Sequence, residues 1–555
     1  MSTGRLFTII IVILALSGCG RADQTVSDSA SVPTSKPTAE LPSTAADTAV
    51  PESTAAQDEV VTPKEIPTEE SSIEPKPGVE ENALLPEPTL FDTSWHDKEI
   101  FRAGLIETEQ AVLDTSRGAS VYHMELTIDE PTSVDGQMQV HVTNQEENPL
   151  QDIYFHLFPD QLGGSITVSE VTVNGAAVQP EIQETALRVP LASALEPGQS
   201  AVVQMDFVTT VPPEEESTKY NILAFNDDIL ALAHFYPMIA VHDDQGWHTE
   251  PTPPHGDETY ADMSHFLVRV TAPQEQVIVA SGVEVDRSAA GPMQTVTIAA
   301  GPVRDFYLVM SDRYGVISDS VGPVQVNSYA PQELLDGAEF ALNAATESLR
   351  SFNIRYGPYP YSELDIVSTP TQALGVEYPG IFANALRIYD LSLESSSGLP
   401  NAALLESVTA HETAHQWFYN LVGNDQLNEP WLDEATAQYA TWMYYVDRYG
   451  EQNADGYYQS LLGRWERTGF ADIPIGMPAE DYDGQEYGAI VYGRGPIFLD
   501  ELAQEMGQET FDTFLREYSK TFRWEIATSE DFQALAEQHC QCDLSAMFDE
   551  AVYAN

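Results

Sequence analysis

Residues 411–415 read His-Glu-Thr-Ala-His, within an apolar helical pattern that runs from Ala402 to Leu421. Because four residues make just over one helical turn, His411 and His415 project from the same face of that helix. Two imidazole nitrogens at this spacing can bind one zinc ion. Glu412 lies one step round the helix, where its carboxylate can take a proton from an attacking water and return it to a leaving amine. The stretch therefore predicts a zinc site carried by a helix.

Glu434 is the candidate for the third protein ligand that a zinc site needs. It follows His415 by nineteen residues, in Glu-Pro-Trp-Leu-Asp-Glu-Ala at the start of the next helical pattern. The alternative is a solvated helix with coincidental histidines, but 12 histidines and 87 acidic residues give only about 0.04 such motifs by chance. Two histidines and one carboxylate leave a fourth position open for water, which is the catalytic arrangement. The pattern predicts one Zn2+ per chain.

This spacing, His-Glu-x-x-His followed after eighteen residues by Glu, resembles the signature of the gluzincin zinc aminopeptidases related to aminopeptidase N. The flanking residues 414–422 (Ala-His-Gln-Trp-Phe-Tyr-Asn-Leu-Val) and 431–434 (Trp-Leu-Asp-Glu) are similar to the zinc helix and third-ligand helix of that family. The resemblance covers roughly residues 95–555. It implies peptide substrates, with Glu412 as the general base and Glu434 as a ligand. The spacing argument reaches the same assignment.

A substrate-binding strand is implied by the resemblance. Residues 374–378 read Leu-Gly-Val-Glu-Tyr, about 35 residues before the zinc helix, where the family has a Gly-x-Met-Glu-Asn strand. By this likeness Gly375 and Glu377 contact the substrate, and Glu377 binds its free α-ammonium group. Three of the five positions depart from the family pattern, which affects how substrate backbone would pair with the strand. The alternative for Glu377 is a solvated carboxylate at a strand end.

An oxyanion-stabilising tyrosine is also implied by the resemblance. Residues 487–495 read Tyr-Gly-Ala-Ile-Val-Tyr-Gly-Arg-Gly, similar to the family's Tyr-x-Lys-Gly segment with Arg494 in place of the usual Lys. The family's tyrosine hydroxyl supports the tetrahedral oxyanion, so Tyr492 is the catalytic candidate. Tyr487, five residues earlier, either lines the same cleft or packs in the core.

The fold class is predicted to be multidomain α+β. At 555 residues, of which 43% are hydrophobic, the chain is long enough for two or three folded units. Strand patterns from Ser120 to Ala299 indicate a β-rich N-terminal domain at 91–325, led by one helix from His96 to Ser116. By the family resemblance, a mostly helical, thermolysin-like zinc peptidase domain is expected at 326–555. Its helical patterns cover 333–352, 402–421, 434–449, 495–506, 509–520 and 529–538, with one short strand at 364–368.

The N-terminus resembles a bacterial lipoprotein signal. Arg5 precedes the apolar stretch Leu6 to Leu16, which is too short to span a bilayer, and Leu-Ser-Gly-Cys follows, ending at Cys19. The resemblance implies removal of the segment before Cys19 and acylation of that cysteine; an ordinary signal peptide is the alternative. Residues 20–90 are rich in Pro, Thr, Ser and Glu and predict a disordered tether. We expect a protein outside the cytoplasm, lipid-anchored to a bacterial membrane.

Composition restricts the partners and the cysteine chemistry. The 24 basic and 87 acidic residues give a net charge of −63, which argues against binding to nucleic acid. Of three cysteines, Cys540 and Cys542 are too close in sequence for an unstrained disulfide, so a strained bond and two thiols both remain open.

Taken together, these patterns predict a zinc-dependent aminopeptidase that hydrolyses N-terminal residues from peptides and is tethered to a membrane by lipid. One alternative is a zinc endopeptidase of the same fold, favoured if the altered strand around Glu377 no longer recognises an amine. The other is a peptide-binding lipoprotein without turnover, although such a protein would not need Glu412.

Overall fold

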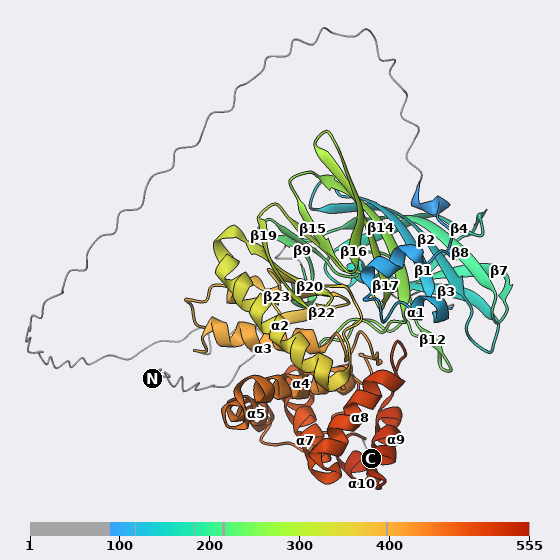
Figure 1. The fold of residues 1–555 in the computed structure, drawn as a ribbon. Coiled ribbons are helices and arrows are strands. Elements are labelled where there is room, and N and C mark those ends of the chain that lie inside the picture. Colours follow the sequence, from blue (N-terminus) through green and yellow to red (C-terminus); the bar gives the residue numbers. More distant parts are fainter. Residues whose placement is uncertain (1–88, 117, 184, 214–216, 396–397, 554–555) are drawn as a thin grey trace, which may run out of the picture. The chain divides into compact units, whose positions relative to one another are not determined.

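A computed structural model describes residues 89–553, apart from 117, 184, 214–216 and 396–397 (Figure 1). The predicted signal at 1–19, with Cys19, and nearly all of the tether at 20–90 lie outside these residues. Within the described part of the chain, no helix combines the length and apolarity needed to cross a membrane.

The largest sheet has eight strands in the order β16-β17-β14-β1-β2-β8-β4-β5, and only the β1–β14 pair is parallel. In β2, buried and more exposed residues alternate because successive side chains point to opposite faces and one face packs on the core. Its strands are β1 (Ser120–Thr127), β2 (Ser133–Thr143), β4 (Ser165–Val173), β5 (Ala176–Ala177), β8 (Ser200–Thr210), β14 (Ser264–Pro273), β16 (Val283–Ala290) and β17 (Met293–Val303).

Smaller sheets complete the β-rich domain. One contains β15 (Val277–Ala280), β18 (Leu308–Ser311), β10 (Ile229–Leu232) and β9 (Leu223–Asn226), in that order. Another contains β11 (Met238–Ile239), β3 (Leu150–His156), β7 (Ala186–Leu195) and β6 (Glu181–Gln183), and a short pair joins β12 (His242–Asp243) to β13 (Gly246–Trp247). The strand-dominated part of the chain is therefore as predicted.

A five-stranded sheet leads into the helical half. Its order is β19 (Tyr314–Val321), β20 (Val324–Pro331), β21 (Glu363–Thr369), β23 (Ile381–Ala385) and β22 (Gly375–Tyr378). The predicted domain boundary at 325/326 falls inside β20, which pairs in parallel with β21. Of these strands, the local sequence pattern indicates β21, expected at 364–368, and the family resemblance implies β22, expected at 374–378. Strands β22 and β23 have four and five residues, too few to set up a recognisable alternation.

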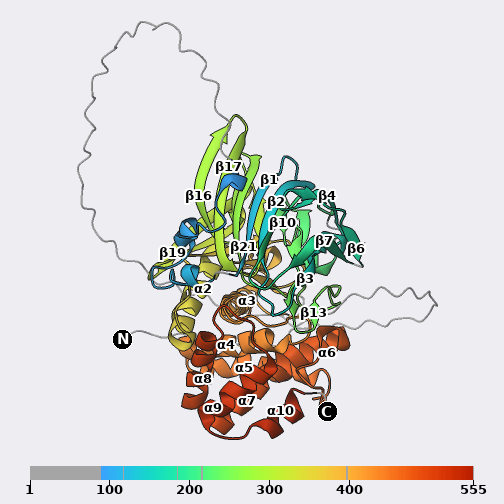
Figure 2. The same cartoon turned by 90° about the vertical axis from the view of Figure 1, so that its right-hand side faces the viewer.

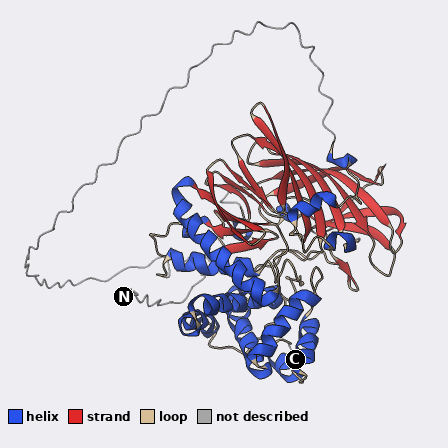
Figure 3. Ribbon diagram, viewed as in Figure 1, coloured by secondary structure: helices blue, strands red, loops and turns tan. Residues whose placement is uncertain are grey.

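Helices dominate from α2 onward, and α4 to α10 gather at the end of the molecule away from the eight-stranded sheet (Figures 2 and 3). The helices are α2 (Leu335–Tyr356), α3 (Asn401–Ala414), α4 (Trp431–Tyr449), α5 (Glu451–Glu466), α6 (Gly484–Ala489), α7 (Gly495–Met506), α8 (Gln508–Thr521), α9 (Ser529–Cys540) and α10 (Ser545–Ala551). The sequence analysis misses α5, whose two glycines and few buried residues weaken its apolar period. Cys540 and Cys542 are joined by a disulfide at the end of α9.

Short helical turns connect these elements. They are η1 (Leu90–Asp92), η2 (Glu99–Gly104), η3 (Phe158–Asp160), η4 (Lys219–Asn221), η5 (Gln332–Leu334), η6 (Leu386–Ile388) and η7 (Ala479–Asp481), together with the π-helical turn η8 (Ile490–Arg494). The one that matters most for the site is η8, because it carries Tyr492.

The prediction of one continuous leading helix over His96–Ser116 is wrong. The segment contains η2 and the four-residue α1 (Val112–Thr115) with a break between them. At the break, Leu105 forms a β-bridge with Tyr361, and the N–H of Ile106 donates to the carbonyl of Pro360 at 3.0 Å. The apolar residues are buried as expected, but pairing with a distant segment replaces the helical hydrogen bonds.

Arg304 connects the β-rich domain to the helical half. Its side chain is buried, with 3% exposure, and it donates to four main-chain carbonyls. These are Tyr419 at 2.7 Å, Asn420 at 3.0 Å, Ala261 at 2.9 Å and Glu525 at 2.7 Å. The first two belong to the turn after α3, so the β-rich domain holds the segment that directly follows the histidine pair.

Candidate active site

Helices α3 and α4 bring His411, His415 and Glu434 together. Nε2 of His411 lies 3.2 Å from Nε2 of His415 and 3.2 Å from Oε2 of Glu434, and the third distance, from His415 to Glu434, is 3.5 Å. Glu434 lies in the first turn of α4, while His411 and His415 are one turn apart at the end of α3. All three side chains are largely buried.

These three atoms fit a zinc ion. Zinc binds histidine nitrogen and carboxylate oxygen at about 2.0–2.1 Å with tetrahedral geometry, which places ligand atoms roughly 3.3 Å from one another. The three measured distances are close to that value. In addition, Oε2 of Glu434 is buried without a hydrogen-bond partner, as expected for an atom that binds a cation. Two histidines and one carboxylate form the donor set of a catalytic zinc site.

The ligand side chains are oriented by the residues around them. Nδ1 of His415 lies 3.0 Å from the carbonyl of Phe418, so it carries the proton, and Nε2 keeps the lone pair that a metal needs. The Gln438 amide contacts the ring of His411 at 3.3 Å and also accepts a hydrogen bond from the hydroxyl of Tyr457 at 2.7 Å. The turn that supplies the Phe418 carbonyl is the one bound by Arg304.

Glu412 lies beside the ligands with no partner for its Oε2 atom, and its side chain is buried. Burial, followed by the negative charge of Glu377, raises the pKa of Glu412 well above its ordinary value. A carboxylate with a raised pKa is a suitable proton acceptor and donor near neutral pH.

Gly375 fits against Glu412 because it has no side chain. A Cβ atom at this position would lie 2.2 Å from Oε1 of Glu412, far inside van der Waals contact. The β22 backbone therefore passes directly over the carboxylate. The sequence motif includes Gly375 but does not explain why glycine is needed there. The close approach of Glu412 explains it, because a side chain at this position would collide with the carboxylate.

Glu377 also lies on β22, and it is not the solvated strand-end carboxylate considered as an alternative. It has 7% exposure and accepts a hydrogen bond of 3.3 Å from the Gln426 amide. Burial is the main cause that raises the pKa of Glu377 to about 7, while the neighbouring His415 opposes the shift. Glu377 is thus a buried carboxylate close to the metal ligands.

Tyr492 reaches the site from η8, and its hydroxyl donates to Oε1 of Glu434, the oxygen that does not face the histidines. Tyr487 lies next to it, with ring centroids 5.8 Å apart, and is buried with no partner for its hydroxyl. Tyr487 therefore both packs in the interior and borders the site, so the two alternatives considered for it do not exclude each other.

The sequence analysis missed two acidic groups near Glu377. Asp433 precedes the third ligand and accepts a hydrogen bond from Gln426 at 2.8 Å; burial and then Glu434 raise its pKa to about 8. Asp257, from the loop before β14, has an unpartnered Oδ2, and burial and then Glu377 raise its pKa well above the usual value. Asp433 could have been noticed beside Glu434, but no local pattern marks Asp257.

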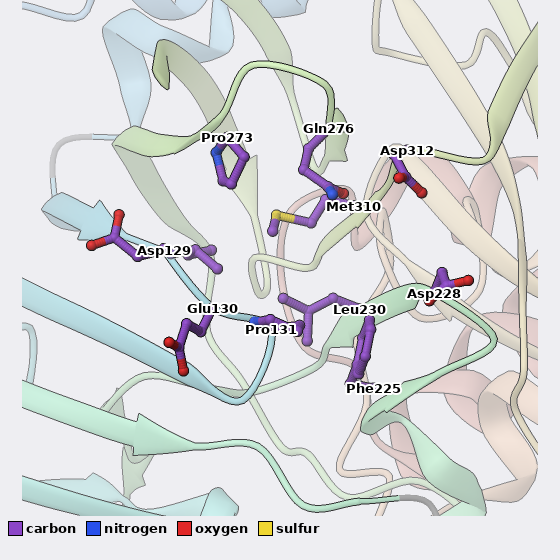
Figure 4. A pocket seen from close by; sticks show the side chains of 11 residues that line it. Asp129, Glu130, Pro131, Phe225, Asp228, Leu230, Pro273, Gln276, Met310 and Asp312 are labelled. Atoms are coloured by element: carbon purple, nitrogen blue, oxygen red, sulfur yellow. The ribbon is translucent and has the colours of Figure 1, made fainter. Parts of the chain in front are cut away.

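A cavity in the β-rich domain contains none of these residues (Figure 4). The cavity has a volume of about 100 Å³, and the apolar residues that line it include Leu230 and Met310. Carboxylates lie around it, contributed by Asp129, Glu130, Asp228 and Asp312. We assign it no part in the chemistry of the histidine pair.

Comparison with known proteins finds relatives of the part of the chain that carries these residues. Residues 340–550 match the family model described as the Peptidase family M1 domain. Aminopeptidase 2 of Candida albicans is 28% identical over 298 residues, which cover 51% of this chain and 32% of that protein. Aminopeptidase M1-B of Oryza sativa subsp. japonica is 27% identical over 297 residues, covering 49% and 32%. The chain thus spans about a third of the length of these relatives.

Solved structures establish the fold class. An M1 zinc metallopeptidase from Deinococcus radiodurans has a TM-score of 0.57 and 21% identity, with coverage of 76% of this chain and 91% of that one. A mutant of the same enzyme bound to a Tyr-Ser-Ala substrate has a TM-score of 0.57 and 20% identity, covering 77% and 92%. The predicted order, a β-rich N-terminal domain followed by a mostly helical domain, is confirmed.

We expect the purified protein to contain about one zinc per chain, measured by elemental mass spectrometry. His415→Ala should lose most of it, because the remaining two ligands cannot complete the site. Acid should also release zinc, since protons compete for the imidazole nitrogens. His96→Ala, at an exposed histidine, is the matched control and should keep full zinc content. A His415→Ala protein with stoichiometric zinc would refute this ligand assignment.

Gly375→Ala should reduce hydrolytic turnover by about a hundredfold while zinc content stays near one per chain. The new methyl group forces Glu412 or β22 to shift, and a displacement of about 1 Å at a reacting group can cost that much. Gly488→Ala is the control, because a Cβ there meets no atom within 4 Å. Equal turnover in the two variants would show that the contact between β22 and Glu412 is unimportant.

Proposed function

We propose that this chain is a zinc-dependent aminopeptidase that removes N-terminal residues from peptides. The observation that carries the proposal is the burial of Glu377 beside His415 and Glu434. A carboxylate held next to the metal ligands favours peptides whose α-ammonium group can reach it. The similarity of residues 340–550 to the M1 peptidase domain supports the same activity.

The proposed roles follow from the geometry. When bound to His411, His415 and Glu434, zinc would supply Lewis-acid chemistry, which polarises a scissile carbonyl and acidifies water. Glu412 takes a proton from the attacking water and delivers it to the leaving amine. Tyr492 offers its hydroxyl to the oxyanion that develops on the substrate carbonyl.

The charge around Glu377 supports an aminopeptidase over the endopeptidase alternative. The carboxylates of Asp257 and Glu258 both interact electrostatically with Glu377. Burial of several carboxylates is costly unless a cation compensates them. A substrate ammonium group provides that cation, whereas the uncharged backbone of an internal peptide segment does not. The presence of Glu412 argues against a non-catalytic peptide binder.

The free amine can be tested directly. Wild-type protein should hydrolyse alanine p-nitroanilide and leave its N-acetylated form intact, and a chelator should stop the reaction. Glu377→Gln keeps the shape of the side chain but removes its charge, so kcat/KM on the free amine should fall by about 30-fold or more. Glu412→Gln should keep its zinc and lose turnover by a factor of about 100 or more.

Two results would contradict this function. Equal cleavage of acetylated and free peptides at internal bonds would establish an endopeptidase. Full substrate binding by zinc-loaded protein with no turnover on any free-amine substrate would favour the peptide-binding alternative.

We also propose that the protein acts outside the cytoplasm, held at a bacterial membrane by lipid on Cys19. The support is the Leu-Ser-Gly-Cys sequence after a short apolar stretch and the Pro-, Thr- and Ser-rich residues that follow. The full-length protein should incorporate labelled palmitate and sediment with membranes, and Cys19→Ser should abolish both. Labelling that persists in Cys19→Ser would refute this anchor.

A further inference from the structure

Two arginines next to the site have no acidic partner, which is unexpected in a chain with 24 basic and 87 acidic residues. Arg464 lies in the last turn of α5 and Arg467 is the residue directly after that helix, and neither forms an ion pair with any residue that the structure describes. The Nη1 atom of Arg464 has only a long contact of 3.4 Å, to the carbonyl of Tyr492. Nε and Nη2 of Arg467 are buried and have no hydrogen-bond partner among the described residues. The fold does not account for these two charges.

Their position connects them with the metal ligands through Tyr492. The guanidinium carbon of Arg464 lies 5.9 Å from the centroid of the Tyr492 ring, and that ring lies 6.1 Å from the ring of His411. Arg464 is therefore within about 12 Å of the His411 ring.

Glu377 and Arg464 lie beside different histidines. The metal-binding atoms of Glu377, His415 and Asp433 all lie within 4.8 Å of one another. Arg464, in contrast, lies over the Tyr492 ring, which is next to the ring of His411. The ligands thus have the Glu377 carboxylate next to one histidine and the Arg464 guanidinium near the other.

We propose that Arg464 and Arg467 bind the C-terminal carboxylate of the substrate, so that the preferred substrates are tripeptides with both termini free. This inference rests on the proposed aminopeptidase function. Guanidinium groups bind carboxylates through paired hydrogen bonds, and two of them compensate the cost of removing one carboxylate from water.

The available length fits a short peptide. An extended chain advances about 3.3–3.6 Å per residue, so two residues after the scissile bond span roughly 7 Å. A guanidinium–carboxylate pair adds about 4 Å between carbon atoms. The sum of about 11 Å is comparable with the separation of at most about 12 Å between the His411 ring and Arg464. A tripeptide whose first residue is held at Glu377 is therefore long enough for its carboxylate to meet Arg464 if the chain runs along Tyr492.

The test compares trialanine with trialanine amide on zinc-loaded, full-length protein. We expect kcat/KM to be at least tenfold higher for the free acid, mainly through KM. A third peptide, Ala-Ala-Glu amide, has an acidic side chain but no C-terminal carboxylate. Its kcat/KM should stay as low as that of trialanine amide. Equal kcat/KM for the free acid and the simple amide would overturn the proposal, and so would full recovery by the glutamate peptide.

Substitution of the two arginines tests whether they cause the preference for the free acid over the amide. Arg467→Gln should reduce the acid-to-amide ratio, and the Arg464→Gln, Arg467→Gln double variant should bring it close to one. Because Arg467 has no side-chain partner in the fold, its single variant remains informative if the double variant does not fold. Arg350→Gln is the control with the same charge change, at an exposed arginine of α2 that pairs with Glu347, and should keep the wild-type ratio. An unchanged ratio in Arg467→Gln and the double variant would overturn the assignment.

Peptide binding to the Glu412→Gln variant tests the carboxylate site independently of the proposed hydrolytic function. Calorimetry with that variant should show at least tenfold tighter binding of trialanine than of its amide. If wild-type protein hydrolyses neither peptide but the binding preference is present, the proposed function fails and the carboxylate site stands. If both peptides are hydrolysed and bound equally, the carboxylate site fails and the proposed function stands.

Discussion

The structure depends on a buried site in which three atoms with lone pairs lie close enough to bind one metal ion. Nitrogen atoms of His411 and His415 and an oxygen atom of Glu434 lie 3.2–3.5 Å apart. Such an arrangement is unfavourable without a cation, because the atoms have left water and present electron density to one another. The neighbouring carboxylates of Glu412 and Glu377 add negative charge. A divalent ion compensates these costs together, which couples metal binding to the stability of the helix pair.

Both halves of the molecule contribute to holding this arrangement. The histidines lie at the end of α3, and the turn that follows provides the Phe418 carbonyl that orients His415. Tyr419 in that turn has a φ of 121°, which is unusual for a residue with a side chain. Arg304 binds the Tyr419 carbonyl, and Asp305 accepts a hydrogen bond of 2.9 Å from its hydroxyl. The β-rich domain therefore stabilises a strained turn directly behind one metal ligand.

The acidic composition has a local consequence at the site. Asp257, Glu377 and Asp433 are buried near the ligands, and burial raises the pKa of each. Lys219 lies 3.7 Å from Glu258 and offsets only part of this charge. Arg464 lies over the Tyr492 ring, and neither it nor Arg467 forms an ion pair with an acid that the structure describes. A peptide with two charged ends can use both the buried carboxylates and the unpaired guanidinium groups.

The sequence by itself determined the histidine pair, Glu412 and Glu434, because their chemistry depends on short spacings along two helices that local periodicity predicts. It also determined the order of strand-rich and helical regions. Only the tertiary structure decided that a leading helix is broken by pairing with Tyr361, that Gly375 leaves room for Glu412, and that Arg464 lies beside Tyr492 without an acidic partner among the described residues. The physical reason is that these features depend on which distant segments come into contact, and a contact between residues far apart in the chain leaves no periodic pattern in either segment.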